Sequence, residues 1–159
     1  QILSDVFGVS HGAGLVECNY SLVTTRPEDL SVIQRLPHFD STDRGRFALL
    51  HYLSNEKAGG TAFFRHRATG FETVSAERLD TYNAALAGEA EKLGLPPAEY
   101  YRGDTDQFEQ IGLVEARPNR LAIYRGLTLH SGIIPEDFSF EASPATGRLT
   151  VNTFLQANA

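Results

Sequence analysis

Three side chains of types that bind metal ions carry the clearest chemical signal in this sequence. His38 and Asp40 stand two positions apart in the run Pro37-His38-Phe39-Asp40. In a β-strand, residues i and i+2 project from the same face, so an imidazole and a carboxylate at this spacing can reach one ion. His130 lies in segment 124–132, which predicts a strand, a turn and a short strand. A strand there is well placed to close a β-helix against an earlier strand and to bring His130 to the other two side chains.

Two histidines and one carboxylate can occupy one face of an octahedral ion and leave three positions for substrate and O₂. This arrangement is typical of non-haem Fe(II) oxygenases, and it predicts His38, Asp40 and His130 as iron ligands. A closed structural zinc site is disfavoured, because Cys18 is the only cysteine and lies far from any histidine pair at zinc-finger spacing.

The elements that must position these residues are mostly short β-strands. Branched and aromatic residues dominate five runs bounded by Gly, Pro, Asn or Asp, namely 15–25, 46–53, 61–67, 121–124 and 148–155. One segment differs, because apolar residues recur at three- and four-residue spacing from Leu79 to Leu93, with Ser75 as the predicted N-cap and Gly94 just past the end. The pattern predicts an antiparallel β-barrel or sandwich with one helical insertion at about 75–94.

Length and composition limit the kinds of protein to which this chain can belong. At 159 residues the chain has the length of one domain, and we expect a single domain over 1–159. No apolar run approaches the roughly 20 residues that cross a bilayer, which predicts a soluble protein without a membrane partner. Acidic residues outnumber basic ones by 20 to 14, so the basic field that nucleic-acid binding requires is absent. The single cysteine and the lack of a leader-like segment at the start favour a cytoplasmic location.

Three sequence blocks extend over about 20–155 in a fixed order. The first is Pro37-His38-Phe39-Asp40, and the second is His51-Tyr52-Leu53-Ser54-Asn55 followed by Gly59-Gly60-Thr61-Ala62-Phe63. The third is Leu129-His130-Ser131-Gly132 with Gly147-Arg148-Leu149-Thr150-Val151. They are similar to an H-x-D motif, to Y-L-N with G-G-x-T-x-F, and to a distal histidine with a following G-x-R/K strand. In this order the blocks resemble the Fe(II)/2-oxoglutarate-dependent oxygenase superfamily, and its prolyl-4-hydroxylase-like branch in particular.

The resemblance implies a double-stranded β-helix, a jelly-roll or cupin-like fold, that uses Fe(II), 2-oxoglutarate and O₂. It implies that Arg148 pairs with the distal carboxylate of 2-oxoglutarate, for which a planar guanidinium is suited, and that Tyr52 hydrogen-bonds to the same group. Tyr20, on a preceding strand, is a further candidate for this pocket. The implied reaction yields succinate and CO₂ while a small-molecule or peptide substrate is hydroxylated or otherwise oxidised.

Two features depart from the family pattern. Residues 133–146 separate His130 from Arg148 more widely than usual, which predicts an elongated turn, and the helical insertion after Gly70 prevents transfer of any known substrate. Two alternatives stay open. One is a β-helix that binds another divalent metal as an isomerase or hydrolase, and the other is a non-enzymatic, metal-binding cupin-like protein.

A basic cluster, Arg65-His66-Arg67, follows the Gly59-Gly60 turn in an otherwise acidic protein. On a strand, Arg65 and Arg67 share one face while His66 takes the other. Two interpretations are open. The arginines either end the strand in solvent and suppress edge pairing, or one of them faces the mouth of the β-helix and clamps a carboxylate or phosphate of an anionic substrate.

Overall fold

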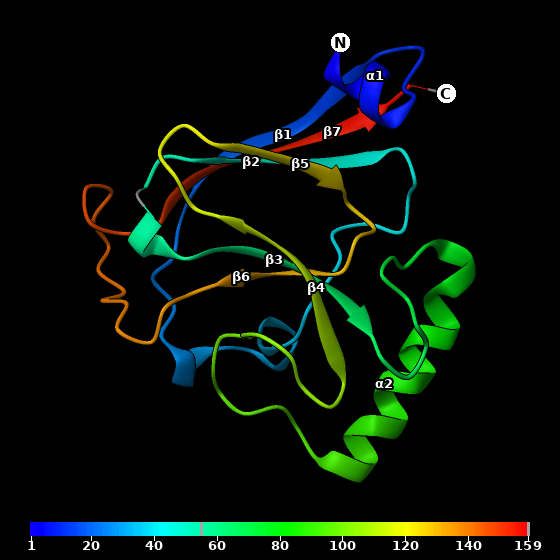
Figure 1. The fold of residues 1–159 in the computed structure, drawn as a ribbon, viewed down its shortest axis with the longest axis vertical. Coiled ribbons are helices and arrows are strands. Elements are labelled where there is room, and N and C mark those ends of the chain that lie inside the picture. The colour runs from blue at the N-terminus through cyan, green and yellow to red at the C-terminus, as the bar shows by residue number, and fades with distance from the viewer. Residues whose placement is uncertain (55, 159) are drawn as a thin grey trace.

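A computed structural model describes residues 1–54 and 56–158, which fold mainly into β-structure (Figure 1). Within these residues, two antiparallel sheets have the strand orders β1-β7-β2-β5 and β4-β3-β6. We call them the larger and the smaller sheet. Their strands are β1 (Ala13–Leu22), β2 (Arg46–Tyr52), β3 (Gly60–His66), β4 (Phe108–Glu115), β5 (Leu121–Arg125), β6 (His130–Ile133) and β7 (Leu149–Ala157).

Strands from opposite ends of the chain pair in a nested order. The first strand, β1, pairs with the last, β7, while β2 pairs with β5 and β3 pairs with β4. Between β1 and β2, His38 forms an isolated bridge to His130 at the start of β6, so this segment takes the place of a strand beside β6. Pairing of β2 with β7 and of β3 with β6 joins the nested pairs into the two sheets. Each of the two sheets therefore combines early and late strands of the chain.

The two sheets lie face to face as two layers (Figure 1). Phe63 of β3 packs edge to face against Tyr124 of β5, with ring centroids 5.2 Å apart. Nearby, Tyr52 and Ala122 of the larger sheet form a buried apolar cluster with Ala116, which follows β4. The period-two pattern of the strands thus divides each sheet into an inner and an outer face.

The helical insertion covers the outer face of the smaller sheet. It consists of the 3₁₀ helix η4 (Ala76–Arg78) and α2 (Leu79–Leu93). Tyr82 of α2 packs into a core with Phe64 and Phe108, whose side chains are fully buried. Burial of these aromatic rings supplies much of the free energy that holds α2 on the sheet.

A shorter helix, α1 (Ile2–Phe7), lies on the outer face of the larger sheet, near the C-terminal end of β7 (Figure 1). Phe7 meets Phe47 of β2 edge to face at 5.1 Å between ring centroids, and the guanidinium of Arg125 lies over both rings. The remaining short elements are the 3₁₀ helices η1 (Pro27–Asp29), η2 (Val32–Arg35) and η3 (Glu56–Ala58).

The Gly59-Gly60 pair lies where three chain segments approach closely. Gly59 has a φ of +82°, and a Cβ there would lie 1.8 Å from the carbonyl oxygen of Ile133. A Cβ at Gly60 would lie 2.4 Å from the carbonyl oxygen of Val114. Side chains are therefore excluded at both positions, and glycine lets β3 begin between β4 and β6.

Most predicted elements are confirmed, with ends shifted by a few residues. The five predicted strands correspond to β1, β2, β3, β5 and β7, the short strand at His130 is β6, and the helix at about 75–94 is η4 with α2. The elongated turn at 133–146 is irregular chain between β6 and β7. Sequence patterning missed β4, whose first residues continue a polar stretch, and α1, which is too short to display a helical period. Asn55 of the second sequence block lies outside the described residues. No helix in the described part of the chain is long and apolar enough to cross a membrane.

Candidate functional site

The structure brings His38, Asp40 and His130 together beside the space between the sheets. Each offers one ligand atom, and the three atoms lie within 4.8 Å of one another. The Nε2 atom of His130 is 3.7 Å from Oδ2 of Asp40. The backbone fixes Asp40 as well, because its N–H donates to the carbonyl of Gly126 at 2.7 Å. The convergence that the H-x-D spacing and His130 predicted is therefore present, and we call these residues the triad.

A hydrogen bond fixes the tautomer of His130. Its Nδ1 atom lies 2.8 Å from the carbonyl oxygen of Thr128. A carbonyl can only accept, so Nδ1 carries the proton and Nε2 keeps its lone pair on the side of Asp40. A metal-ligating histidine is commonly oriented by such a bond from its other ring nitrogen to a backbone carbonyl.

Burial sets the protonation of the triad. It lowers the pKa of His38 to about 4, with the charge of His130 acting in the same direction and that of Asp40 opposing it. Burial also lowers the pKa of His130. The pKa of Asp40 is raised by burial, and His38 partly offsets this rise. Both imidazoles are consequently neutral near pH 7, which is the form that binds metals.

The donor set fits a divalent metal ion. Two imidazole nitrogens and a carboxylate oxygen suit Fe, Mn, Co or Zn, and three protein ligands leave coordination positions for other molecules. The side chain of Asp40 is only 18% exposed. A cation at this point would offset the cost of burying that carboxylate, and bonds of about 2.0–2.2 Å would draw the three ligand atoms closer together.

A cavity of about 200 Å³ lies between the sheets and is lined both by the triad and by Arg148. We call it the inner cavity. Its polar walls include Thr61 of β3 and Asn152 of β7, and its apolar walls include Leu50 and Phe154. The cavity therefore links a candidate metal centre to a cationic side chain.

Arg148 is a buried cation that has no carboxylate partner among the described residues. Its side chain is 6% exposed, and Nη2 donates to the carbonyl of Gly60 at 2.9 Å. The Nε atom has no hydrogen-bond partner within that part of the chain. Burial lowers the pKa of this guanidinium. A buried charge is costly unless it is paired, so an anion in the inner cavity would be stabilised by this guanidinium.

Tyr52 lies behind Arg148 rather than in the cavity. Its ring is fully buried, and the guanidinium carbon of Arg148 is 5.6 Å from the ring centroid. The Tyr52 hydroxyl donates to Oγ1 of Thr61 at 2.6 Å. Tyr52 does not line the inner cavity. The structure therefore gives it a position in which it orients Arg148 and Thr61.

Tyr124 is a cavity residue that the sequence motifs missed. It lies on β5, its ring is 4.8 Å from that of His130 between centroids, and it lines the inner cavity. Its hydroxyl makes no hydrogen bond to another described residue, and burial, reinforced by the charge of Asp40, raises its pKa. The signal that could have found it is strand alternation, because Tyr124 shares a face with buried Ala122.

Tyr20 is not brought to this group. Its side chain is 77% exposed on β1 and does not line the inner cavity. β1 is an edge strand of the larger sheet, so among the described residues no strand pairs with it on its other side. The position of Tyr20 does not support the role suggested for it by its place on a preceding strand.

Arg65 and Arg67 are also outside the cavity and are engaged by acidic residues. Arg65 forms ion pairs with Glu72 and Glu109 at 2.5 and 3.1 Å, and Arg67 lies 3.5 Å from Asp104. As expected for a strand, His66 points to the opposite face, where it is fully buried against Tyr82. The ion pairs do not favour a substrate clamp, and β3 is the central strand of the smaller sheet, so the arginines do not guard a sheet edge either.

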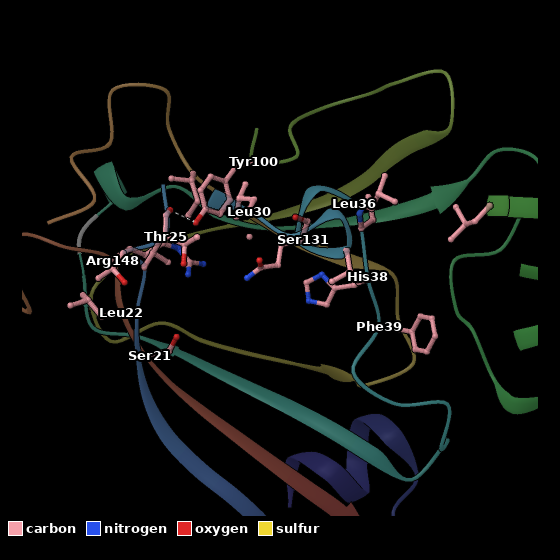
Figure 2. Close-up of a pocket in the computed structure, with 18 of the residues that line it drawn as sticks. Ser21, Leu22, Thr25, Leu30, Leu36, His38, Phe39, Tyr100, Ser131 and Arg148 are labelled. Carbon is pink, nitrogen blue, oxygen red and sulfur yellow. Dashed lines mark hydrogen bonds between the residues drawn. The ribbon is translucent and has the colours of Figure 1, made fainter. Parts of the chain in front are cut away.

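A second cavity, of about 600 Å³, opens beside β6, and we call it the outer cavity. It is lined by segment 21–25, by several residues between Leu30 and Phe39, by one face of α2, and by Tyr100, Ser131 and Arg148. Figure 2 shows His38, Ser131 and Arg148 around one open space, with Leu30 and Tyr100 along its rim. His38 and Arg148 line both cavities. The outer cavity is therefore the larger chamber through which the triad can be reached.

Comparisons with known proteins give a family without an assigned activity. No curated protein and no solved structure matches the chain. Residues 1–155 match a family described as "Family of unknown function (DUF6445)". Because this match spans nearly the whole chain, the protein belongs to the DUF6445 family.

Proposed function

We propose that this protein is a non-haem Fe(II), 2-oxoglutarate-dependent oxygenase on a double-stranded β-helix. One observation carries the proposal. The triad and the unpaired guanidinium of Arg148 line the same inner cavity of about 200 Å³. A ligand that binds a metal through one end and carries an anionic group at the other would satisfy both. The sequence blocks that resemble this superfamily supply the same residues.

The strand topology supports the fold. In a jelly roll, a long antiparallel hairpin is rolled up so that early strands pair with late ones. The nested pairs β1–β7, β2–β5 and β3–β4 follow this scheme. The bridge between His38 and His130 supplies the remaining pair, between the segment before β2 and β6. The same bridge is what unites the H-x-D motif with the distal histidine.

The iron would be held by His38, Asp40 and Nε2 of His130. Thr128 keeps the proton of His130 on the opposite ring nitrogen, at 2.8 Å. His130 could therefore bind a metal through Nε2 without moving a proton between its ring nitrogens and without turning its ring. Three protein ligands would leave coordination positions for 2-oxoglutarate and O₂.

Arg148 would bind the distal carboxylate of 2-oxoglutarate. Its free Nε atom and the planar geometry of guanidinium suit a bidentate contact. Thr61 and Tyr124 line the same cavity and offer hydroxyl groups to that carboxylate. Tyr52 packs under the guanidinium and limits its movement. Phe154 and Leu50 form apolar walls of the same cavity, and a ligand that displaces water from it would strengthen these charge interactions.

The chemistry supplied when Fe(II) and 2-oxoglutarate are bound is oxidation of a substrate C–H bond by O₂, with 2-oxoglutarate converted to succinate and CO₂. The protein contributes orientation and a dry, shaped site. His38 lines both cavities, so a substrate in the outer cavity would lie next to the metal centre.

Succinate formation from 2-oxoglutarate under air, with Fe(II) and a reductant, tests the proposal. Wild-type protein should form succinate slowly even without a substrate, and Asp40→Ala should not. Asp80→Ala, which removes an exposed aspartate, is the matched control and should behave like wild type. Metal binding without 2-oxoglutarate binding or succinate would reject the oxygenase and favour a cupin-like protein with another metal-dependent role.

A further inference from the structure

The outer cavity differs sharply in character from the inner cavity. Its walls are mainly aliphatic and aromatic, with Leu22, Leu30, Ile33 and Leu86 among them. Its volume of about 600 Å³ lies within the usual range for a small-molecule site, about 300–1,000 Å³. A cavity of this size beside the triad is the natural place for the molecule that is oxidised.

Charge is nearly absent from the outer cavity. Among its described lining residues, no Asp, Glu or Lys occurs, and Arg148 is the single permanent charge. Arg148 also lines the inner cavity. If 2-oxoglutarate occupies the inner cavity, its carboxylate neutralises Arg148, and no side chain remains to offset a charge on a molecule in the outer cavity. An ionic group there would be desolvated without a partner.

Two hydrogen bonds link the segment before His38 to the loop that follows α2, and the first lies in the wall of the outer cavity. The Tyr100 hydroxyl donates to the carbonyl of Thr25 at 2.8 Å, a bond that Figure 2 draws. Arg35 reaches the carbonyl of Pro96 at 3.3 Å. These bonds join segment 23–36 to the loop that follows α2.

We propose that the outer cavity binds the primary substrate of this protein, and that this substrate is a neutral, largely apolar small molecule. The inference rests on the proposed function, because it requires 2-oxoglutarate to occupy Arg148. The polar amide and hydroxyl groups of Asn83 and Ser131 give the substrate a few points of orientation within the apolar walls. The substrate's reactive carbon lies toward His38, the triad member that reaches this cavity.

A matched pair of fluorescent probes tests the inference. N-phenylnaphthylamine is neutral, and anilinonaphthalene sulfonate adds one negative charge to the same aromatic skeleton. Both are titrated without oxygen into protein that is saturated with Fe(II) and 2-oxoglutarate. The neutral probe should bind at least about tenfold more tightly than the sulfonate, because the sulfonate would be buried without a counter-charge.

Two variants of η2 locate the probe. Ile33 lines the outer cavity and is 64% exposed, so Ile33→Asp should fold normally and weaken the neutral probe by about fivefold. Val32, its neighbour, is 40% exposed and does not line the cavity, so Val32→Asp should leave probe binding unchanged. Equal probe affinity in the two variants would overturn the assignment of the site.

Calorimetric titration with 2-oxoglutarate, in the absence of any probe, distinguishes failure of the proposed function from failure of the inference about the substrate. If 2-oxoglutarate binds but the sulfonate binds as tightly as the neutral probe, the inference of a neutral substrate is overturned and the proposed function survives. If 2-oxoglutarate does not bind and the sulfonate is preferred, the proposed function and the inference of a neutral substrate both fail. Arg148 would then bind an anionic group in the outer cavity. If 2-oxoglutarate does not bind and the neutral probe is still preferred, the proposed function fails, and the inference fails with it because it requires 2-oxoglutarate on Arg148.

Discussion

His38 and His130 face each other with their ring centroids 4.6 Å apart, held by two reciprocal backbone hydrogen bonds. The N–H of His38 donates to the carbonyl of His130 at 2.9 Å, and the reverse bond is 2.8 Å long. This bridge uses only main-chain atoms, so it survives substitution of either side chain. The arrangement of the triad is therefore set by the fold and does not require a bound metal.

Replacing Asp40 or His130 by alanine should abolish tight metal binding while the sheets stay folded. Loss of a residue that merely orients a ligand typically costs about 10- to 100-fold in metal affinity, so loss of a ligand should cost at least about 100-fold. Titration with Co(II), followed by visible absorbance, measures the affinity, and far-ultraviolet circular dichroism measures the fold. Asp80→Ala and His11→Ala remove exposed side chains of the same types and serve as controls. Wild-type Co(II) affinity in Asp40→Ala would mean that the metal binds elsewhere or not at all.

Arg148→Met should affect ligand binding and stability in different ways. Affinity for 2-oxoglutarate should fall by about 1.5–3 kcal/mol, the range for a hydrogen bond to a charged group, which is roughly tenfold to hundredfold. Co(II) affinity should not change. The free energy of unfolding of the ligand-free protein should be equal or higher, because the variant removes a buried charge that no carboxylate of the described residues pairs with. Calorimetry and urea denaturation measure the two effects.

Two control variants accompany Arg148→Met. Arg148→Lys keeps the charge but lacks the planar fork, so its 2-oxoglutarate affinity should lie between wild type and Arg148→Met. Arg120→Met removes an arginine that bonds to the carbonyl of Glu115 outside both cavities, and it should bind 2-oxoglutarate normally. A marked loss of stability in Arg148→Met, with unchanged 2-oxoglutarate affinity, would identify Arg148 as a purely structural residue.

The triad could be predicted from sequence in part because two of its residues lie close together in the chain. His38 and Asp40 follow from strand geometry over three residues, and the position of Arg148 follows from the order of the sequence blocks. A local residue pattern does not show which of Tyr52 and Tyr124 presents its hydroxyl to the inner cavity. Both occupy inner-face positions, but depth along the sheet decides which hydroxyl meets the cavity, and that depth depends on the register of β2 with β5. Long-range register is not contained in a local residue pattern.

The role of Arg65 illustrates the same limit. Strand alternation predicted correctly that Arg65 and Arg67 share one face. It could not supply their acidic partners, because Glu109 reaches Arg65 only through the pairing of β3 with β4, in which the two residues lie opposite each other. Sequence patterning did not predict the start of β4. Without that strand, an arginine with two carboxylate partners cannot be distinguished from one that is free to bind a substrate.

Arg65→Gln and Arg67→Gln should therefore leave the chemistry unchanged. Neither side chain lines a cavity that contains a triad residue. The 2-oxoglutarate affinity, succinate formation and affinity for the neutral probe should all match wild type when each variant is assayed separately. A weaker substrate or probe in either variant, with unaltered 2-oxoglutarate turnover, would restore the interpretation of these arginines as a clamp for an anionic group.

The stability of the metal-free protein should fall with acidification between about pH 6.5 and pH 4. The folded state lowers the pKa of His38 to about 4 from the ordinary value of 6.5. In this window the unfolded chain binds a proton that the native protein does not, so the free energy of unfolding rises with pH. For His38 alone the change is up to about 3 kcal/mol. The raised pKa of Asp40 acts in the opposite sense, at the acidic end of the window.

Urea denaturation of the metal-free protein across this pH range tests the effect. His38→Gln removes the titrating ring, so its free energy of unfolding should depend less steeply on pH than that of wild type. His11→Ala, at an exposed position, should keep the wild-type slope. Parallel curves for wild type and His38→Gln would show that burial of His38 does not control the acid sensitivity of the fold.

The last prediction separates the two tyrosines. The Tyr124 hydroxyl lines the inner cavity and has no hydrogen-bond partner among the described residues, and its raised pKa keeps it protonated as a donor. Tyr124→Phe should therefore weaken 2-oxoglutarate by about 0.5–1.5 kcal/mol, or about twofold to tenfold, with little effect on stability. Tyr52 instead donates to Thr61 in the core, so Tyr52→Phe should lower the free energy of unfolding by about 0.5–1.5 kcal/mol and leave 2-oxoglutarate affinity nearly unchanged. Because each variant removes one oxygen atom and retains the ring, each serves as the control for the other. The reverse outcome, with 2-oxoglutarate weakened only in Tyr52→Phe, would restore the role that the family resemblance implies for Tyr52 and would require Tyr52 to reach the cavity when the ligand binds.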